Sequence, residues 1–189
     1  MMSLEVKNTS IEGLVLIRPE RYIDERGYFS ETFSLRDFAC VVGEHIDFVQ
    51  DNESKSKAGV VRGLHFQIPP NAMGKLVRVV KGSITDVAVD LRKNSPTYGK
   101  HEAVSLDAND GWQFWIPEGF AHGFIAHEDD TIVAYKCTEF YNPESEQSLH
   151  WNDPQLAIDW GIESPLISSR DDDADSFAKF DSPFVEKQK

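Results

Sequence analysis

Short apolar runs recur along most of the chain, separated by polar positions and turn-forming residues. The runs are rich in β-branched and aromatic residues and are bounded by Gly, Pro, Asn and Asp, a pattern typical of strands joined by turns. It predicts ten strands, at Leu14–Ile17, Gly27–Phe33, Phe48–Asn52, Val60–Phe66, Leu76–Val80, Ile84–Leu91, His101–Leu106, Gln113–Ile116, Ala121–Ala126 and Thr131–Cys137.

One helix stands out from this background, at Leu35–Val41. Ser34 is a residue type that caps helices, and Asp37 follows three positions later, a variant of the capping box. A second short helix is expected near the C-terminus, where Pro154, Pro165 and Pro183 divide the remaining chain into loops.

About ten strands in a chain of 189 residues indicate one all-β domain covering residues 1–189. Closing or doubling the sheet removes exposed strand edges, which favours a jelly-roll barrel with a few short helices. Such a barrel can hold one small ligand at its mouth. We expect the tail from about residue 165 to pack over the barrel.

The net charge of −13 changes the picture of possible partners. A nucleic-acid binder needs a track of basic residues, and this sequence has none, so that class is excluded. Cys40 and Cys137 lie far apart and outside any CxxC motif, which favours a reduced cytoplasm. No run approaches the roughly 18 apolar residues of a membrane-spanning helix, so no membrane partner is expected.

The segment Val61–Gln67 places Arg62, His65 and Gln67 within or just after an otherwise apolar strand. Burying such groups is costly unless they are paired or face a cavity, so either a satisfied core histidine or a site explains them. Strict alternation puts Arg62 and His65 on opposite faces. Both can serve one pocket only if the strand is irregular near Gly63, and we predict that irregularity.

Lys75 and Tyr135 indicate a site only when they are considered together with the other motifs. Lys75 opens an apolar strand after Gly74 and shares a face with Val77 and Val79; alone, it is best interpreted as a lysine reaching solvent. Tyr135 shares a strand face with Val133, and packing alone explains it.

The segment Trp115–Phe124 bends at Pro117 and Gly119 and presents His122 at the start of the next strand. It resembles the second motif of the cupin superfamily, whose members are double jelly-roll barrels. Metal-binding cupins carry a close pair of histidines in the first motif, where this chain has only His65. Two scattered imidazoles are too few for a metal site, so we predict none.

Together the motifs resemble the family of dTDP-4-dehydrorhamnose 3,5-epimerases, over about Ile11 to Asp171. The motifs that carry the resemblance are, in order, Asp24–Glu31, Phe48–Asn52, Arg62–Gln67, Gly74–Arg78, Asp86–Arg92, Pro117–Phe124 and Tyr135-Lys136. Each motif is weak by itself, whereas the ordered set is specific.

The resemblance implies a role for particular residues. His65 would be the general base and Asp171 its orienting partner, Tyr135 the general acid on the opposite face of the sugar, and Lys75 the group facing the C4 ketone oxygen. The residues implied to hold the nucleotide, diphosphate and sugar are Arg26, Glu31, Gln50, Asp51, Asn52, Arg62, His122, Glu146 and Arg170. Arg170 departs from the lysine usual in the family, which exchanges a point ammonium for a planar fork.

The implied reaction converts dTDP-4-dehydro-6-deoxy-D-glucose into dTDP-4-dehydro-L-rhamnose. The hydrogens on C3 and C5 both lie next to the C4 ketone, so their removal gives an enolate and no redox cofactor is needed; the chain has no GxGxxG loop. The step requires a base with a pKa near neutrality, such as histidine, and a cation at the oxyanion. It also requires an acid, and we expect neighbouring Lys or Arg to lower the phenol's pKa.

The diphosphate suits the guanidinium groups of Arg26 and Arg62. Phe29 and Trp112 both fit stacking on the base. The resemblance also implies a homodimer whose N-terminal strands cross to the partner, so that Arg26 and Glu31 would serve the neighbouring site.

Three alternatives remain at this stage. A relative that inverts only C3 or only C5 would carry the same residues. A metal-dependent cupin oxygenase or isomerase would bind iron, zinc or manganese in stoichiometric amount. A non-catalytic sugar-nucleotide binder would keep Arg26 and Arg62 but has no need for His65, Asp171 and Tyr135 together.

Overall fold

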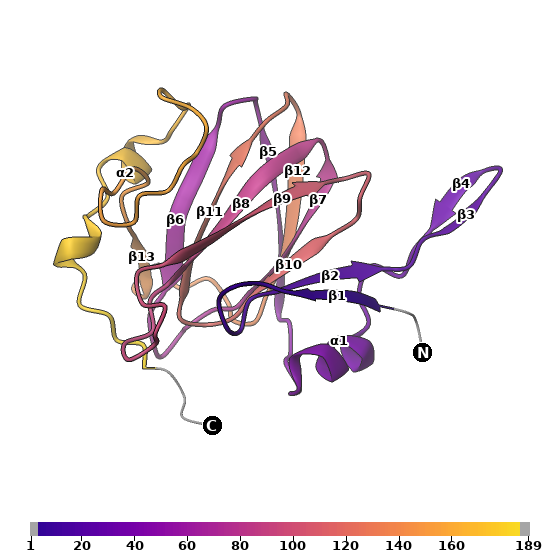
Figure 1. Ribbon diagram of the computed structural model, residues 1–189, viewed down its shortest axis with the longest axis horizontal. Coiled ribbons are helices and arrows are strands. Elements are labelled where there is room, and N and C mark those ends of the chain that lie inside the picture. The colour runs from indigo at the N-terminus through magenta and orange to yellow at the C-terminus, as the bar shows by residue number, and fades with distance from the viewer. Residues whose placement is uncertain (1–3, 186–189) are drawn as a thin grey trace.

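Two antiparallel β-sheets face each other in the computed structural model, which describes residues 4–185 (Figure 1). The first sheet has the order β1 (Leu4–Asn8), β2 (Val15–Pro19), β10 (Gln113–Ile116), β7 (Lys75–Lys81), β12 (Thr131–Cys137), β5 (Gln50–Ser56). The second has the order β13 (Glu146–Ser148), β6 (Val61–Gln67), β11 (Phe120–Ala126), β8 (Ser83–Asp90), β9 (His101–Asp107). The predicted all-β, jelly-roll class is confirmed.

A continuous apolar cluster fills the space between the sheets. On β7, Val77 and Val79 point into it while Leu76 points outward, which is the period-two alternation of a strand with two covered faces. Phe114 and Phe124 add large buried rings from β10 and β11. Polar side chains inside this barrel are therefore exceptions that the apolar lining makes conspicuous.

The outer face of the first sheet is covered by helix α1 (Leu35–Val42). The Ser34 side chain accepts a hydrogen bond from the Asp37 backbone N–H, the predicted cap, and Gly43 ends the helix in the left-handed conformation with φ of 79°. Phe38 meets the Trp115 ring edge-on at a centroid distance of 5.1 Å. This aromatic contact fixes the helix on the sheet.

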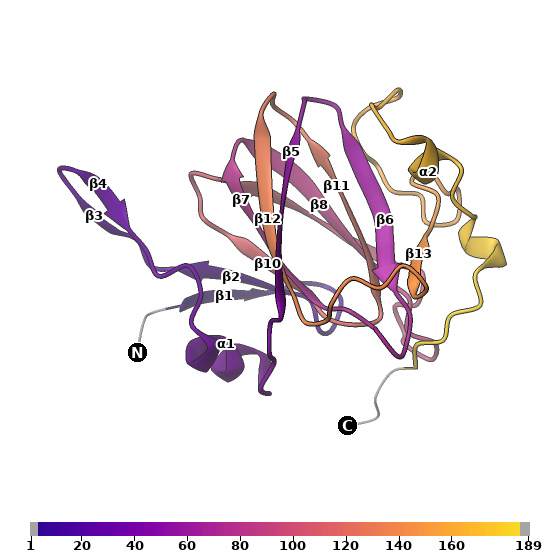
Figure 2. The same ribbon diagram turned by 180° about the vertical axis from the view of Figure 1, so that it is seen from behind.

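The outer face of the second sheet is covered by the chain that follows β13, including helix α2 (Ser169–Asp172) and the short helix η1 (Phe177–Lys179) (Figure 2). Trp151, Trp160 and Phe184 from this segment pack on Phe66 and its neighbours in one buried cluster. The predicted second helix corresponds to α2.

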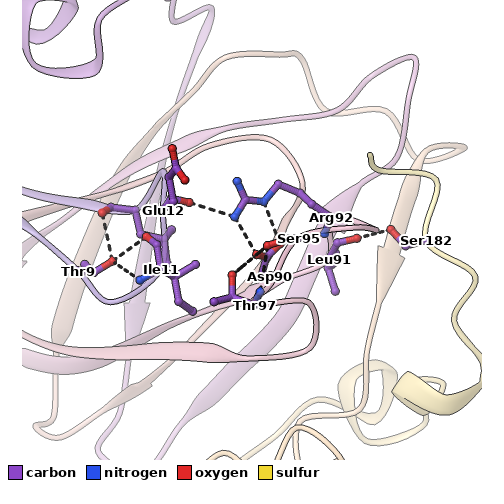
Figure 3. A network of polar contacts seen from close by, with 10 residues as sticks. Thr9, Ile11, Glu12, Asp90, Leu91, Arg92, Ser95, Thr97 and Ser182 are labelled. Atoms are coloured by element: carbon purple, nitrogen blue, oxygen red, sulfur yellow. Dashed lines mark hydrogen bonds and ion pairs between the residues drawn. The ribbon is translucent and has the colours of Figure 1, made fainter. Parts of the chain in front are cut away.

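A buried carboxylate ties three parts of the chain together. Asp90 is fully buried, and the side chains that donate hydrogen bonds to it are those of Arg92, Ser95 and Thr97 (Figure 3). Arg92 also donates to the Glu12 carbonyl oxygen at 3.0 Å, and the Ser182 hydroxyl donates to the Leu91 carbonyl oxygen. The network joins the β1–β2 turn, the β8–β9 connection and the end of the C-terminal segment.

The strand prediction was right in its central part and wrong near the ends of the chain. The predicted limits of β10 and β12 match, whereas strands β1 and β13 were missed. The prediction of one strand at Gly27–Phe33 was wrong, because the chain there forms a hairpin of β3 (Tyr22–Asp24) and β4 (Gly27–Phe29). Strand β5 begins two residues later than predicted and runs on to Ser56.

Strand β6 contains the predicted irregularity. His122 faces His65 across the ladder, but Phe124 faces Arg62, so the register shifts by one residue between them. Gly63 lies in this shift with φ of 134°, and a Cβ there would come within 2.5 Å of the Gly123 Cα. Both the backbone conformation and the close approach require glycine.

We expect Gly63→Ala to lower the free energy of unfolding by about 3 kcal/mol, since it adds backbone strain and a backbone clash. Gly161→Ala is the matched control, because Gly161 also has a positive φ, of 68°, but a methyl group added there would have nothing within 4 Å. It should cost about 1 kcal/mol. Urea denaturation of the wild type and the two variants measures both values. Equal losses of unfolding free energy would show that the close approach at Gly63 contributes nothing to the cost.

Candidate active site

The register shift in β6 brings Arg62 and His65 to the same side of their sheet. Val61, Leu64 and Phe66 all belong to the outer apolar cluster, although Val61 and Leu64 are three residues apart. Arg62 and His65 are their neighbours in sequence and therefore share the inner face. Without the extra residue, one of the two would point into the outer cluster.

His65 is held by a carboxylate from the segment that wraps the barrel. Its Nε2 lies 2.6 Å from Asp171 Oδ1, and the Asp171 side chain is only 6% exposed, against 31% for His65. Helix α2 carries Asp171, and the Ser168 hydroxyl accepts from the Asp171 backbone N–H at its N-terminus. Burial acts to raise the pKa of Asp171, but the hydrogen bonds, above all with His65, hold it below its ordinary value.

This contact fixes the tautomer of the imidazole. An ionised Asp171 can only accept, so Nε2 carries the hydrogen and Nδ1 keeps its lone pair. His65 can therefore act as a base through Nδ1, while Asp171 stabilises the imidazolium that forms.

Lys75 turns into the barrel rather than to solvent. Its Nζ lies 3.4 Å from the His65 carbonyl oxygen and 5.9 Å from the centre of the Tyr135 ring. Burial lowers the pKa of Lys75, against the attraction of the Asp86 and Glu146 carboxylates. The interpretation of Lys75 as a strand-end residue reaching solvent is wrong.

Tyr135 lies on the same sheet as Lys75, opposite the sheet that carries His65. It lies on β12 and packs on the interior cluster, sharing the Val133 face as predicted. Burial raises the pKa of the Tyr135 phenol, and a hydrogen bond from Asn52 and the charge of Arg62 only partly oppose that. The expectation of a lowered pKa was wrong, because loss of solvent outweighs the neighbouring cations.

A second histidine pairs with a second carboxylate deeper in the barrel. His122 Nε2 lies 2.6 Å from Asp86 Oδ1, with His122 7% exposed and Asp86 fully buried. Burial lowers the pKa of His122, although Asp86 acts to raise it. The His122 ring centre is 6.5 Å from that of Tyr135, so His122 is within the same cluster.

Strand β5 divides the predicted substrate residues between its two faces. Gln50 and Asn52 point inward with Tyr135, which lies directly opposite Asn52. Asp51 points the other way, toward solvent, where Lys136 Nζ binds its carboxylate at 3.0 Å. Strand alternation sends Asp51 to the opposite face from Gln50 and Asn52, so the structure does not bring Asp51 to the cluster.

Glu146 and Arg170 meet at the rim of the cluster. Arg170 donates to Glu146 Oε2 at 2.7 Å, and the Tyr141 hydroxyl donates to the same oxygen at 2.6 Å. Burial acts to raise the pKa of Glu146, but the hydrogen bonds of Tyr141 and Arg170 lower it. Arg62, nearer the other end of β6, is exposed, and its Nε donates to Ser56 Oγ at 3.1 Å.

Arg26 and Glu31 lie apart from this cluster. Arg26 sits in the β3–β4 hairpin, which extends away from the barrel (Figure 1), and its exposed guanidinium pairs with Asp24. Of the two candidate stacking residues, Phe29 lies on this hairpin and is 69% exposed. Trp112 is covered by the cations of Lys7 and Arg18, at 4.1 and 4.8 Å from its ring.

Asp86 and Tyr141 are two residues that the sequence reasoning did not single out. Asp86 belongs to one of the matched motifs but was given no role of its own. A carboxylate in the middle of an apolar strand is the feature of the sequence that could have indicated one. Tyr141 lies beyond β12, half exposed, and its backbone N–H donates to Gln50 Oε1 at 3.0 Å. Only the fold brings that loop back to β5.

Within residues 4–185, no group of three or more His, Cys, Asp or Glu side chains is arranged to hold a metal ion. The same part of the chain contains no helix of the length and apolar character needed to span a membrane.

Comparison with known proteins places this geometry in a family. The family model described as dTDP-4-dehydrorhamnose 3,5-epimerase matches residues 8–179. A curated dTDP-4-dehydrorhamnose 3,5-epimerase of Methanothermobacter thermautotrophicus is 54% identical over 166 residues, which are 86% of this chain and 89% of the relative.

Solved structures agree. That of dTDP-6-deoxy-D-glucose-3,5-epimerase from Legionella pneumophila, in complex with dTDP-4-keto-L-rhamnose, has a TM-score of 0.93 and 44% identity, covering 99% of this chain and 100% of that one. ChmJ, a 3'-monoepimerase from Streptomyces bikiniensis in complex with dTDP-quinovose, has a TM-score of 0.85 and 34% identity, covering 90% and 86%. The chain belongs to the dTDP-4-dehydrorhamnose 3,5-epimerase family.

Proposed function

We propose that this protein is an isomerase that inverts C3 and C5 of dTDP-4-dehydro-6-deoxy-D-glucose, giving dTDP-4-dehydro-L-rhamnose. One observation carries the proposal. In a chain of this family, the Asp171-bound imidazole of His65 and the phenol of Tyr135 come from opposite sheets. The Lys75 ammonium lies 3.4 Å from the His65 carbonyl oxygen and 5.9 Å from the centre of the Tyr135 ring. A sugar ring held between the sheets would meet a base on one face and an acid on the other.

His65 is the base in this mechanism. Its Nδ1 takes the hydrogen from the carbon next to the ketone, and the electron pair of the broken C–H bond moves into the enolate, with negative charge on the C4 oxygen. Asp171 stabilises the resulting imidazolium. Because Asp171 is buried, solvent screens its attraction to the imidazolium less than it would at the surface.

Lys75 and Tyr135 complete the step. Lys75 stabilises the charge on the C4 oxygen, and its apolar surroundings strengthen that interaction. Tyr135 then delivers its proton to the opposite face of the carbon, which inverts the centre and leaves a phenolate. Solvent water returns a proton to Tyr135 and takes the one held by His65, so both groups are restored for the second centre. A phenol is already protonated at neutral pH, so the acid is present when it is needed.

Arg62 and Tyr141 are suited to the nucleotide. Arg62 is the exposed guanidinium on the inner face of β6, placed to fork onto diphosphate oxygens. Tyr141 offers an aromatic face at the rim, anchored through Gln50 and Glu146, and we favour it over Phe29 and Trp112 as the stacking residue within one subunit.

The extended β3–β4 hairpin supports a homodimer. Tyr22, Ile23, Tyr28 and Phe29 leave it with a largely apolar exposed surface, which is stabilised when a second copy covers it. Arg26 and Glu31 would then serve the neighbouring site. The free thiols of Cys40 and Cys137 fit a reduced, cytoplasmic location.

A relative that inverts a single centre remains the second candidate, because the likeness to ChmJ covers most of the chain. The lower identity to ChmJ than to the relatives named as 3,5-epimerases favours inversion at both centres.

The reaction is tested by incubation with dTDP-4-dehydro-6-deoxy-D-glucose in D₂O with a chelator present. We expect deuterium at both C3 and C5 of an inverted product, and loss of both on His65→Asn, because the base is gone. Nuclear magnetic resonance locates the label. Label at one carbon only would favour the single-centre alternative, and no exchange at either carbon would refute the proposal. Activity abolished by the chelator would favour a metal-dependent reaction.

Lys75→Met separates the catalytic role of Lys75 from a structural one. We expect kcat to fall about 10²–10³-fold, because the oxyanion loses its cation. The unfolding free energy should rise, since the variant no longer buries an ammonium. Steady-state kinetics and urea denaturation measure the two effects, and a fall in both activity and stability would instead assign Lys75 to the scaffold.

The stability gain of Lys75→Met should depend on pH. The folded pKa of Lys75 lies below its ordinary value of 10.5, so the unfolded chain binds more protons between the two values and wild-type stability rises with pH there. The advantage of the variant is therefore largest below the folded pKa and disappears as pH approaches 10.5. Denaturation midpoints of both proteins from pH 7 to 10.5 test this, and a constant difference would contradict it.

A further inference from the structure

A chain of hydrogen bonds runs along the inner face of β5 and ends beside the proposed acid. The Tyr141 backbone N–H donates to Gln50 Oε1 at 3.0 Å, and Gln50 Nε2 donates to Asn52 Oδ1 at 2.9 Å. Asn52 Nδ2 then lies 3.6 Å from Cys137 Sγ. Asn52 is also directly opposite Tyr135, and Gln50 directly opposite Cys137, in the β5–β12 ladder.

The direction of this chain is fixed at its first link. A backbone N–H can only donate, so the amide oxygen of Gln50 must face Tyr141. That orientation turns the Gln50 NH₂ group toward Asn52, which must accept with its own oxygen. Asn52 is left with its NH₂ group, two donors and no acceptor, facing Tyr135 and Cys137.

The thiol at the end does not compete for this role. Cys137 is fully buried, and burial raises its pKa to about 11, so it stays protonated and is only a weak acceptor. Tyr135 lies directly opposite Asn52 in the ladder, and its hydroxyl oxygen is a stronger acceptor than a thiol sulfur. A hydrogen bond from Asn52 to that oxygen acts to lower the pKa of Tyr135, against burial, which raises it.

We propose that Gln50 and Asn52 position the phenol of Tyr135 by presenting only donors to it, so that its proton is left for the substrate. This rests on the proposed function, in which Tyr135 is the acid. A phenol hydroxyl has a single proton, and an acceptor beside it would hold that proton within the protein. Gln50 and Asn52 thereby act on the reaction through Tyr135, apart from any contact that they make with the nucleotide sugar.

Replacing an amide of this hydrogen-bond chain by a carboxylate presents an acceptor to Tyr135 in place of a donor. In Gln50→Glu both terminal oxygens accept, so Asn52 must turn its NH₂ group toward Glu and present its oxygen to Tyr135. Asn52→Asp puts an acceptor there directly and leaves Gln50 unchanged. The matched control is Gln147→Glu, which makes the same chemical change on an exposed residue of β13.

The experiment measures, in D₂O, the ratio of deuterium exchange with retention to inversion of the same carbon centre. His65 is untouched in these variants, so it still removes the proton and returns a deuteron from its own side, which gives exchange with retention. We expect the ratio of exchange to inversion at C5 to rise about tenfold or more in Gln50→Glu and in Asn52→Asp, since acid catalysis is weakened. Tyr135→Phe should show the same change more strongly, and Gln147→Glu none.

The outcomes separate a positioning role of Gln50 and Asn52 from a role as substrate contacts alone. A higher KM for either variant with an unchanged ratio would overturn the proposal and leave Gln50 and Asn52 as substrate contacts alone. If one of the two variants fails to fold, the ratio in the other decides. The proposed function fails separately, by absence of exchange in the wild type. Undiminished inversion by Tyr135→Phe would remove Tyr135 as the acid and overturn the proposal with it.

Discussion

The contact between His65 and Asp171 is the constraint on which the rest of the structure depends. It joins the inner face of β6 to helix α2, two parts of the chain more than a hundred residues apart. For Asp171 to reach His65, the C-terminal segment must pack on the outer face of the second sheet, where Trp151, Trp160 and Phe184 hold it. The apolar cluster on that face therefore serves the site as well as the stability of the fold.

The irregularity of β6 serves the same pocket. A regular strand would direct Arg62 and His65 to opposite faces, and the shift at Gly63 gives both to the pocket while Val61, Leu64 and Phe66 keep the outer cluster intact. Glycine is required there by its backbone conformation and by the approach of Gly123. A single local feature thus reconciles the packing of one face with the chemistry of the other.

Much of this could be predicted from the sequence, because the relevant signals are local. Alternation on β7 placed Lys75 with Val77 and Val79, and the conflict between Arg62 and His65 predicted the shift near Gly63. The hairpin of β3 and β4 could not be predicted, since its apolar residues are exposed in the described chain and its pattern matched a single strand. Strand β13 is short and polar, and its partner β6 alone defines it.

The pKa of Tyr135 shows where local reasoning ends. Burial is a property of the whole fold, and it outweighs the cations that the sequence placed nearby. Asp51 belongs to the matched motif, yet alternation sends it to solvent while Gln50 and Asn52 face inward.

Buried polar groups in an apolar barrel are stabilised by their partners, and the pairs formed here determine how protons are distributed over the site. Asp171 takes the Nε2 hydrogen of His65 and leaves Nδ1 open to act as a base. On the opposite sheet, the proposed role of the chain from Tyr141 through Gln50 to Asn52 is to offer donors to Tyr135 and leave its proton free. In the proposed mechanism one sheet thus accepts a proton and the other gives it, which is the asymmetry that inversion of a carbon centre demands.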